Sequence, residues 1–291
     1  MPETVEIFEV GPRDGLQNEA RQIPTVDKIG LVDKLSTAGF RRIEVASFVS
    51  PKWVPQMADS AAVLEGITRA PGISYAALTP NIKGFERASA AGADEVAVFG
   101  SASEGFSRAN INATVEESLD RFAPVTEAAR AAGIPVRGYV SCVVECPYDG
   151  PVAPASVAHV AARLAEMGCY EISLGDTVGA GTPERIGAML AAVLGVVPAA
   201  RLAGHYHATG GRALENIEAS LARGVRVFDA AVGGLGGCPF APGAAGNVAT
   251  EAVHDRLVAL GYDTGLDRDI LNDAAETARA MRSGPVVENG T

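Results

Sequence analysis

The segment VEIFEVGPRDGLQNE, residues 5–19, contains a strand pattern that stops abruptly and gives way to charged side chains. Residues 5–10 alternate well enough to predict a strand, and a Gly-Pro pair ends it. Arg13 and Asp14 follow at once, so the strand delivers two opposite charges to one place. A surface turn with an exposed ion pair would have the same sequence, because such pairs are common and weak. However, polar residues follow the carboxyl end of one strand after another along this chain, which favours a shared site.

Strand and helix patterns alternate along the rest of the chain, at roughly 30 residues a unit, which is typical of a (β/α)8 TIM barrel of the α/β class. An open, doubly wound sheet is the alternative. No G-x-G-x-x-G motif follows the first strand, which weakens a dinucleotide-binding interpretation. The predicted strands are 5–10, 42–47, 73–78, 95–99, 134–142, 170–174, 202–207 and 225–232.

The helices predicted between these strands begin and end at recognisable signals. Thr25 is expected to cap the first helix, and Thr114 with Glu117 has the spacing of a capping box. The predicted helices are 25–39, 57–68, 82–91, 114–132, 154–167, 183–196, 211–222, 247–260 and 267–281. Because no linker or low-complexity segment interrupts the pattern, we expect one catalytic domain over residues 1–291. Within it, about 264–291 forms a C-terminal helical extension and tail.

Composition and charge narrow the class of protein. The chain has 291 residues, of which 47% are hydrophobic and 20% charged, as in ordinary folded proteins. A formal net charge of -11 without a basic run argues against a nucleic acid or an anionic membrane as partner. The four cysteines are too few and too scattered for a disulfide framework. The first strand begins almost at Met1, and the longest apolar run is too short to span a bilayer, so we expect a cytoplasmic protein.

The sharpest chemical signal is His205-Tyr206-His207 on the seventh predicted strand. Residues i and i+2 of a strand point to the same side, so the two imidazoles face one way. Two hydrogen-bonded core histidines would have the same pattern. Asp14 arrives at the same mouth of a barrel, since only the eighth strand separates the first from the seventh. One carboxylate and two imidazoles, completed by water or a substrate oxygen, suit Mg²⁺ or Mn²⁺, with Zn²⁺ not excluded.

Two further carboxylates lie on or just after strands. Glu44 stands between Ile43 and Val45, so it points into the barrel if those two face the helices, and a buried carboxylate must be paired. Arg13 is the obvious partner. Asp176 follows the sixth strand, where it either caps the next helix or contributes to the site; its place at the barrel mouth favours the site.

Cys238 lies in a glycine-rich loop, GGLGGCP, residues 233–239. Three interpretations stay open for this loop. The cysteine is a free surface thiol without a role, or a catalytic group that a mobile loop carries over the site. Alternatively the loop binds phosphate, as loops after the last two strands of barrels often do.

Six segments together resemble 3-hydroxy-3-methylglutaryl-CoA lyases, members of the DRE-TIM metallolyase group, over residues 5 to about 265. The strings GPRDGLQNE and GGLGGCP are long and unusual, and therefore specific. The six are EVGPRDGLQNE, SFVSPKWVPQM, LTPN, RGYVSC, CYEISLGDT and GGLGGCP.

The resemblance implies an activity and a role for each candidate residue. Lyases of this family cleave 3-hydroxy-3-methylglutaryl-CoA to acetyl-CoA and acetoacetate, and are commonly dimers or larger, so a homo-oligomer is expected. The implied ligands of a divalent metal, Mg²⁺ or Mn²⁺, are Asp14, His205, His207 and Asn247. By the same resemblance Arg13 binds the thioester carbonyl, Cys238 is the catalytic cysteine, and Glu44 and Asp176 are acidic residues of the active site.

Retro-Claisen chemistry supports these roles, since it needs a proton acceptor for a tertiary alcohol and positive charge for a developing enolate. The proton acceptor is left open between Asp176, His205 and Cys238. A condensing synthase of the same superfamily shares the histidine pair, but GGLGGCP with its cysteine discriminates against it. A barrel that only binds CoA esters or phosphate ligands would leave the metal residues unexplained.

One stretch departs from the family. Where the family usually has H-D-T-Y-G-Q, this chain has His207-Ala208-Thr209-Gly210-Gly211-Arg212. Removing a carboxylate and an aromatic ring beside a metal ligand opens volume unless Arg212 folds in. We therefore expect that a glutaryl-CoA with a C3 substituent longer than methyl is accepted at least as well as the methyl compound.

Overall fold

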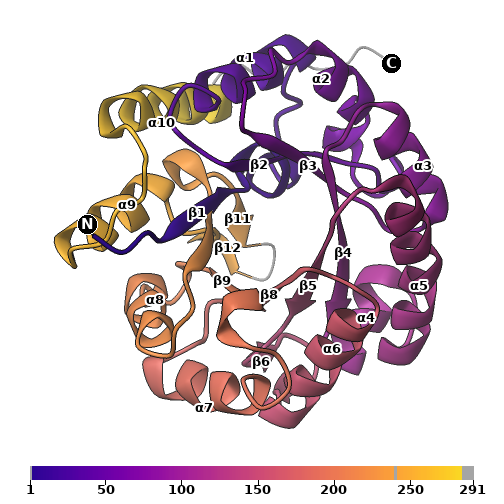
Figure 1. Ribbon diagram of the computed structural model, residues 1–291. Helices are drawn as coiled ribbons and strands as arrows, with labels where there is room; N and C mark the ends of the chain where they lie inside the picture. Colours follow the sequence, from indigo (N-terminus) through magenta and orange to yellow (C-terminus); the bar gives the residue numbers. More distant parts are fainter. Residues whose placement is uncertain (1, 239–240, 284–291) are drawn as a thin grey trace.

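The computed structural model describes residues 2–238 and 241–283, in which eight parallel strands close into a barrel. The strands follow the order β1-β10-β9-β8-β5-β4-β3-β2, with the helices outside them (Figure 1). The predicted TIM barrel is therefore confirmed. Its strands are β1 (Glu6–Glu9), β2 (Arg42–Ser47), β3 (Ser74–Leu78), β4 (Glu95–Ser101), β5 (Val136–Ser141), β8 (Glu171–Asp176), β9 (Leu202–Tyr206) and β10 (Val227–Ala230).

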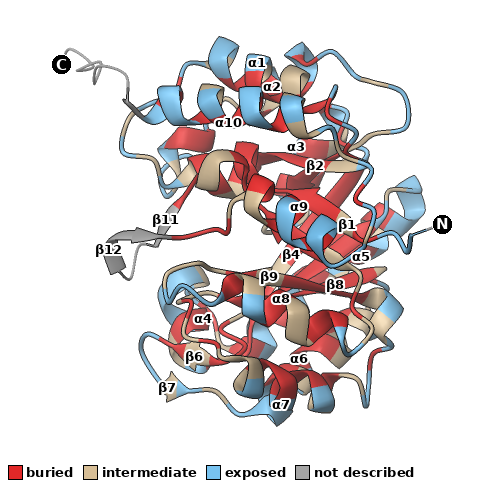
Figure 2. Ribbon diagram, turned by 90° about the vertical axis from the view of Figure 1, so that its left-hand side faces the viewer, coloured by how far each residue is buried: buried red, intermediate tan, exposed pale blue. Residues whose placement is uncertain are grey.

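The helices form an outer layer around the barrel. Figure 2 shows the strands largely buried and the exposed residues mainly on the helices and loops. Strands covered on both faces are expected to be apolar on both, as these mostly are. The helices are α1 (Thr25–Leu35), α2 (Ser60–Gly66), α3 (Ile82–Ala90), α4 (Glu104–Ile111), α5 (Val115–Ala132), α6 (Pro154–Glu166), α7 (Pro183–Val193), α8 (Ala213–Leu221), α9 (Thr250–Ala259) and α10 (Arg268–Ser283).

Of the two predicted helix N-terminal caps, the structure confirms the one at α5 and not the one at α1. The capping box at α5 is present: Glu117 N donates to Thr114 Oγ1 at 3.1 Å and Thr114 N donates to Glu117 Oε2 at 2.8 Å. The predicted cap of α1 is wrong, because Pro24 precedes the helix and Thr25 is already its first residue. Thr25 Oγ1 instead donates to Asp59 Oδ2 at 2.8 Å and so ties α1 to the segment before α2.

Several elements arise in stretches expected to be loops. The polar stretch after β4 contains α4, whose first turn is capped because Ser103 Oγ accepts from Phe106 N at 3.3 Å. Residues Gly11–Gly15 form one π-helical turn rather than an irregular loop. The other additions are the hairpins β6 (Glu145–Cys146) with β7 (Gly150–Pro151) and β11 (Gly237–Cys238) with β12 (Ala241–Ala245), and the 3₁₀ turns Pro55–Met57, Ala199–Arg201 and Val232–Gly234.

The last helix, α10, packs beside α1. Lys34 Nζ donates to Thr277 Oγ1 at 2.9 Å, and Asp267 N donates to Ala38 O at 2.9 Å just before α10 begins. This helix accounts for most of the predicted C-terminal extension, and residues 284–291 lie outside the described part. The single-domain assignment of the chain stays a prediction. Among the described helices, none has the length and apolar character needed to cross a membrane.

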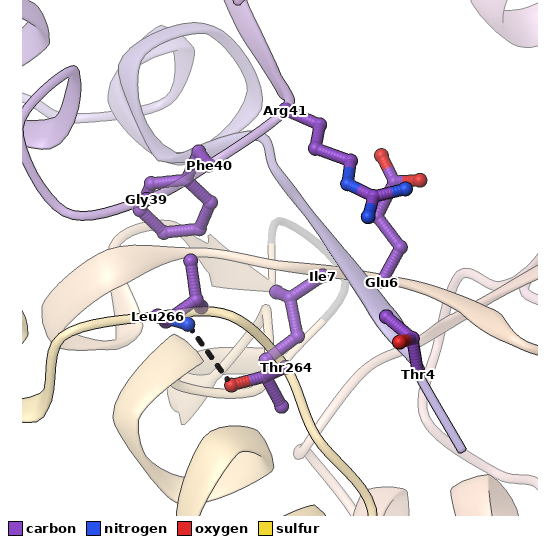
Figure 3. A pocket seen from close by; sticks show the side chains of 8 residues that line it. All are labelled: Thr4, Glu6, Ile7, Gly39, Phe40, Arg41, Thr264 and Leu266. Atoms are coloured by element: carbon purple, nitrogen blue, oxygen red, sulfur yellow. Dashed lines mark hydrogen bonds between the residues drawn. The ribbon is translucent and has the colours of Figure 1, made fainter. Parts of the chain in front are cut away.

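The two ends of the barrel differ in what they could bind. A small hollow at the amino-terminal end is lined by Thr4 and Glu6 near the start of β1, and by Thr264 (Figure 3). Leu266 N donates to Thr264 Oγ1 there at 3.3 Å. Active sites of TIM barrels form at the opposite, carboxyl end. The candidate residues lie at that opposite end.

Candidate metal centre

Three of the predicted residues meet at the carboxyl end of the barrel. Asp14, His205 and His207 each offer a ligand atom, and these atoms lie within 4.8 Å of one another. Asp14 comes from the turn after β1, and His205 lies on β9 with His207 just after it. The strand order explains the meeting, because β10 alone separates β1 from β9. No other such cluster is found among the described residues.

The two histidines present the same ring atom to one point. His205 Nε2 lies 3.3 Å from His207 Nε2 and 3.9 Å from Asp14 Oδ2. Two nitrogens that each lie about 2.1 Å from one ion are roughly 3.0–3.4 Å apart, so this spacing fits shared coordination. Burial and the neighbouring His205 lower the pKa of His207 to about 4, so its ring is neutral at pH 7. The donor set therefore fits a divalent cation.

Asp14 is held in place from three sides. Arg13 Nη1 donates to Asp14 Oδ1 at 2.5 Å, Gln17 Nε2 donates to the same oxygen at 2.9 Å, and Asn247 Nδ2 donates to Oδ2 at 2.9 Å. Burial opposes ionisation, but Arg13 and the two histidines hold the pKa of Asp14 below its ordinary value. The side chain is thus an ionised, fixed carboxylate at the cluster.

Asn247, the fourth expected ligand, also lies at the cluster. Besides its contact with Asp14, its backbone pairs with that of His207 in an isolated β-bridge, and its side chain is buried. This bridge joins the segment after β12 to the segment after β9. The structure therefore brings all four expected metal-binding residues together.

Arg13 and Glu44 form the buried pair that the sequence predicts. Arg13 Nε and Nη2 lie 2.7 and 2.5 Å from Glu44 Oε2. Tyr139 OH donates to the same oxygen at 3.1 Å, and the Arg13 guanidinium lies 5.6 Å from the centre of the Tyr139 ring. Burial raises the pKa of Glu44 although Arg13 opposes the shift. Tyr139 is a neighbour of the site that sequence reasoning missed.

A second set of missed residues lies deeper in the barrel. Asp229 of β10 accepts from Arg137 through both oxygens, at 2.7 and 3.0 Å, and from Ser173 Oγ at 2.8 Å. Its Oδ2 also lies 3.1 Å from His205 Nδ1. Arg137 and Asp229 are polar residues within buried strands, the same signal that singled out Glu44. That signal could have found them.

Asp176 makes its hydrogen bonds with the β8–α7 loop. Asp176 is the last residue of β8 and pairs in register with Tyr206, whereas Gly175 pairs with His205. Its two carboxylate oxygens accept from Ala180 N at 3.1 Å and Gly181 N at 2.8 Å. These contacts are those of a carboxylate that shapes the β8–α7 loop. Its role as an acidic residue of the active site stays a prediction.

Cys238 is described only through its backbone, which pairs with that of Ala241 in the β11–β12 hairpin; its side chain lies outside the described part. The preceding residues lie against the turn that carries Arg13 and Asp14. A Cβ on Gly15 would stand 2.6 Å from Leu235 Cβ, and a Cβ on Gly236 would stand 3.3 Å from Gly15 Cα. This close approach places the start of the glycine-rich loop beside the metal centre.

The stretch that departs from the family packs tightly against the β8–α7 loop. A Cβ on Gly210 would stand 2.4 Å from Gly179 O, so backbone fills the space where a side chain would begin. The side chain of Arg212 is exposed. A side chain at this position would therefore require the β8–α7 loop to shift.

Comparison with known proteins agrees with the geometry. A family model described as HMGL-like matches residues 4–278. The 3-hydroxy-3-isohexenylglutaryl-CoA/hydroxy-methylglutaryl-CoA lyase of Pseudomonas aeruginosa is 58% identical over 97% of this chain and 94% of its own length. The mitochondrial hydroxymethylglutaryl-CoA lyase of Gallus gallus is 58% identical over 94% of this chain and 91% of its own length.

A solved structure extends the likeness to three dimensions. The crystal structure of the HMG-CoA lyase from Brucella melitensis superposes with a TM-score of 0.96 at 61% identity, covering 97% of this chain and 100% of that one. A likeness at this identity and coverage extends over nearly the whole chain. With the family model spanning nearly all of the described residues, the chain belongs to the HMGL-like family.

Proposed function

We propose that this protein is a carbon–carbon lyase that cleaves 3-hydroxy-3-methylglutaryl-CoA to acetyl-CoA and acetoacetate. The observation that carries the proposal is the cluster of Asp14, His205 and His207 beside the Arg13–Glu44 pair. Relatives at 58% identity are named as lyases for this substrate. The family and the lyase class agree with the prediction from the sequence.

A divalent metal would be held by Asp14, His205 and His207, with Asn247 beside them. Bound there, it would supply positive charge that acidifies the tertiary hydroxyl of the substrate and orients it. Oxygen and imidazole ligands suit Mg²⁺ or Mn²⁺, which are the ions that we propose.

Arg13 is the group that we place at the thioester carbonyl. Its guanidinium carries a fixed positive charge, because Glu44 and Asp14 hold it from two sides. Negative charge develops on the thioester oxygen as the bond between C2 and C3 breaks and its electron pair forms the enolate. A fixed donor aimed at that oxygen stabilises the transition state more than the ground state.

Two proton transfers complete the reaction. The hydroxyl proton leaves as the C3 oxygen becomes the ketone of acetoacetate, and the enolate carbon of acetyl-CoA takes up a proton. We propose Cys238 for the second transfer, because the glycine-rich loop begins beside the metal centre. For the first, Asp176 and Cys238 remain as candidates, because in the proposed centre both ring nitrogens of His205 are engaged, Nδ1 with Asp229 and Nε2 with the ion.

The test is turnover with added Mg²⁺ or Mn²⁺ on a small panel of CoA esters. We expect release of acetyl-CoA and acetoacetate that depends on the metal. Absence of cleavage for every ester would overturn the proposal. The reverse, condensing reaction is tested in the same assay by supplying the products, and we expect cleavage to dominate.

The same panel decides the C3 substituent. The relative from Pseudomonas aeruginosa has a name that includes both an isohexenyl ester and the methyl compound, whereas the relative from Gallus gallus is named for the methyl compound alone. We therefore propose the methyl compound as the substrate, and expect kcat/KM for it to be at least that for a long-chain ester. A higher value for the long-chain ester would support the larger pocket instead.

We also propose, as the sequence predicts, that an acyl-CoA is the partner, that the protein forms a homo-oligomer and that it resides in the cytoplasm. The net charge of -11 opposes binding to nucleic acid. Sedimentation and cell fractionation test the oligomer and the location.

A further inference from the structure

The carboxylate of Asp229 contacts His205 from the barrel interior but is not one of the candidate metal ligands. Asp229 on β10 stands directly opposite His205 on β9 in the register of the two parallel strands. Its Oδ2 lies 3.1 Å from His205 Nδ1, which leaves Nε2 of the same ring to face His207 and Asp14. The contact therefore decides which ring atom points toward the other two side chains.

Asp229 is itself unable to turn. Arg137 donates to both of its oxygens and Ser173 Oγ donates to one. Arg137 is fully buried and lies between two aromatic rings, 4.4 Å from the centre of Phe8 and 4.9 Å from that of Tyr139. Four donors around one buried carboxylate fix its position and its charge.

His207 is held differently. No carboxylate contacts its Nδ1, which is buried and makes no hydrogen bond of ordinary geometry among the described residues, and the backbone of Thr177 is its polar neighbour. Of the two histidines, only His205 has a carboxylate behind its ring.

We infer that Asp229 is a positioning residue of the metal centre, which holds the His205 ring so that Nε2 carries the lone pair offered to a divalent cation. This inference rests on the proposed function, because it concerns the same centre. A carboxylate that accepts from Nδ1–H fixes the tautomer and the ring angle of a metal-binding imidazole. Asp229 does not act as a ligand, since its oxygens face Arg137, Ser173 and Nδ1.

The alternative is that Asp229 only balances the buried charge of Arg137. Glu171 offers a matched control, because its Oε1 accepts from Arg137 Nε at 2.7 Å. Glu171 is equally an acidic residue of the barrel interior, but it lies at the amino-terminal start of β8, where its charged partners among the described residues are Arg42 and Arg137. Loss of either carboxylate removes one partner of Arg137, whereas only one of them touches His205.

The experiment titrates the full-length protein, stripped of metal by a chelator, with Mn²⁺ alone and measures bound Mn²⁺ by electron paramagnetic resonance. We expect Asp229→Asn to weaken Mn²⁺ binding by about 10- to 100-fold, the usual effect of losing such a partner. Glu171→Gln is expected to bind Mn²⁺ close to the wild-type affinity. Equal weakening in both variants would overturn the inference in favour of charge balance, and unchanged binding in Asp229→Asn would overturn it outright.

Two further measurements test the inference if Asp229→Asn does not fold. Ser173→Ala removes one donor to Asp229 without changing any charge, and we expect it to weaken Mn²⁺ binding relative to the wild type, whereas wild-type affinity in this variant would count against the inference. Nitrogen NMR of the wild-type protein in alkaline buffer should show His205 protonated at Nδ1; a proton at Nε2 would overturn the inference. If the wild-type protein binds no Mn²⁺, the proposed metal-dependent function fails first, and this inference fails with it.

Discussion

Arg13 Nη2 lies 2.5 Å from Glu44 Oε2, and the side chain of Glu44 is entirely buried inside the barrel. The ion pair therefore holds the Arg13 guanidinium at the barrel mouth by the edge that carries Nε and Nη2. Its Nη1 reaches Asp14 at 2.5 Å, so the same side chain links the metal centre to the barrel wall. Coulombic attraction to Glu44 and Asp14 outweighs burial and raises the pKa of Arg13.

Arg13→Lys keeps the positive charge but cannot contact Glu44 and Asp14 with a planar fork. We expect kcat to fall by about 10²- to 10³-fold, the scale of a lost oxyanion donor, with a smaller change in KM. Steady-state kinetics with 3-hydroxy-3-methylglutaryl-CoA measures the split. A lysine variant with wild-type kcat would remove Arg13 from the catalytic role.

His205→Ala and His207→Ala should each abolish metal-dependent turnover while the fold survives, because each removes an imidazole from the cluster. His159→Ala is the control: its side chain is 53% exposed on α6 and pairs with Glu116. Circular dichroism checks the fold and Mn²⁺ titration checks the ion. Wild-type metal dependence in either cluster variant would show that the metal lies elsewhere.

Cys238→Ala should slow turnover by about 100-fold or more, the contribution of a lost general acid or base, with KM little changed. Cys169→Ala is a suitable control, since that thiol is buried just before β8, away from the cluster. The measurement is kcat across the pH range. Equal rates for Cys238→Ala and the wild type at every pH would reduce Cys238 to a bystander.

The buried ion pair of Arg13 and Glu44 was predictable, because Glu44 is a carboxylate between two apolar strand residues. The same reasoning extends to Arg137 and Asp229, which also interrupt buried strands. Asp176 shows the limit of such reasoning. Its position at a strand end is visible in the sequence, but the direction of its side chain depends on the pairing with Tyr206, which the sequence does not reveal.

The eight strands were predictable because apolar runs recur with helical patterns between them, and all eight lie within a few residues of their expected bounds. The short hairpins and α4 were not, since a polar stretch has no period to distinguish a loop from a capped helix. Ser103 caps α4, but the sequence alone does not distinguish it from a serine in an irregular loop. The packing of Gly210 on Gly179 depends on contacts between segments far apart in the sequence, which no local pattern encodes.

Glu9 should make stability depend on pH. Its carboxylate accepts from Gly11 N, Val232 N and Thr250 Oγ1, at 2.8, 2.9 and 2.6 Å, and so links three segments around the site. Burial outweighs these hydrogen bonds and raises the pKa of Glu9 to about 7, from an ordinary value of 4.5. Between those two pH values the folded state binds more protons than the unfolded state, so the free energy of unfolding falls as pH rises.

The Glu9→Gln variant carries no titrating group at this position and isolates the effect. We expect the wild type to lose about 2–4 kcal/mol relative to this variant between pH 4.5 and 8, with the change complete just above pH 7. Denaturant unfolding of both proteins at several pH values measures it. A constant difference between them would show that Glu9 titrates normally.

Closure of the barrel has a consequence for how the protein is made. Asp14 contacts Asn247, 233 residues further along, and β1 gains its partner β10 only near the end of synthesis. At 5–20 residues per second, the first strand waits roughly 10–50 s with one edge unpaired. The ribosome must therefore synthesise the chain past Asn247 before the side chains of Asp14, His205, His207 and Asn247 can meet. A chain that stops before Asn247 lacks one of these four residues and the contact that it makes with Asp14.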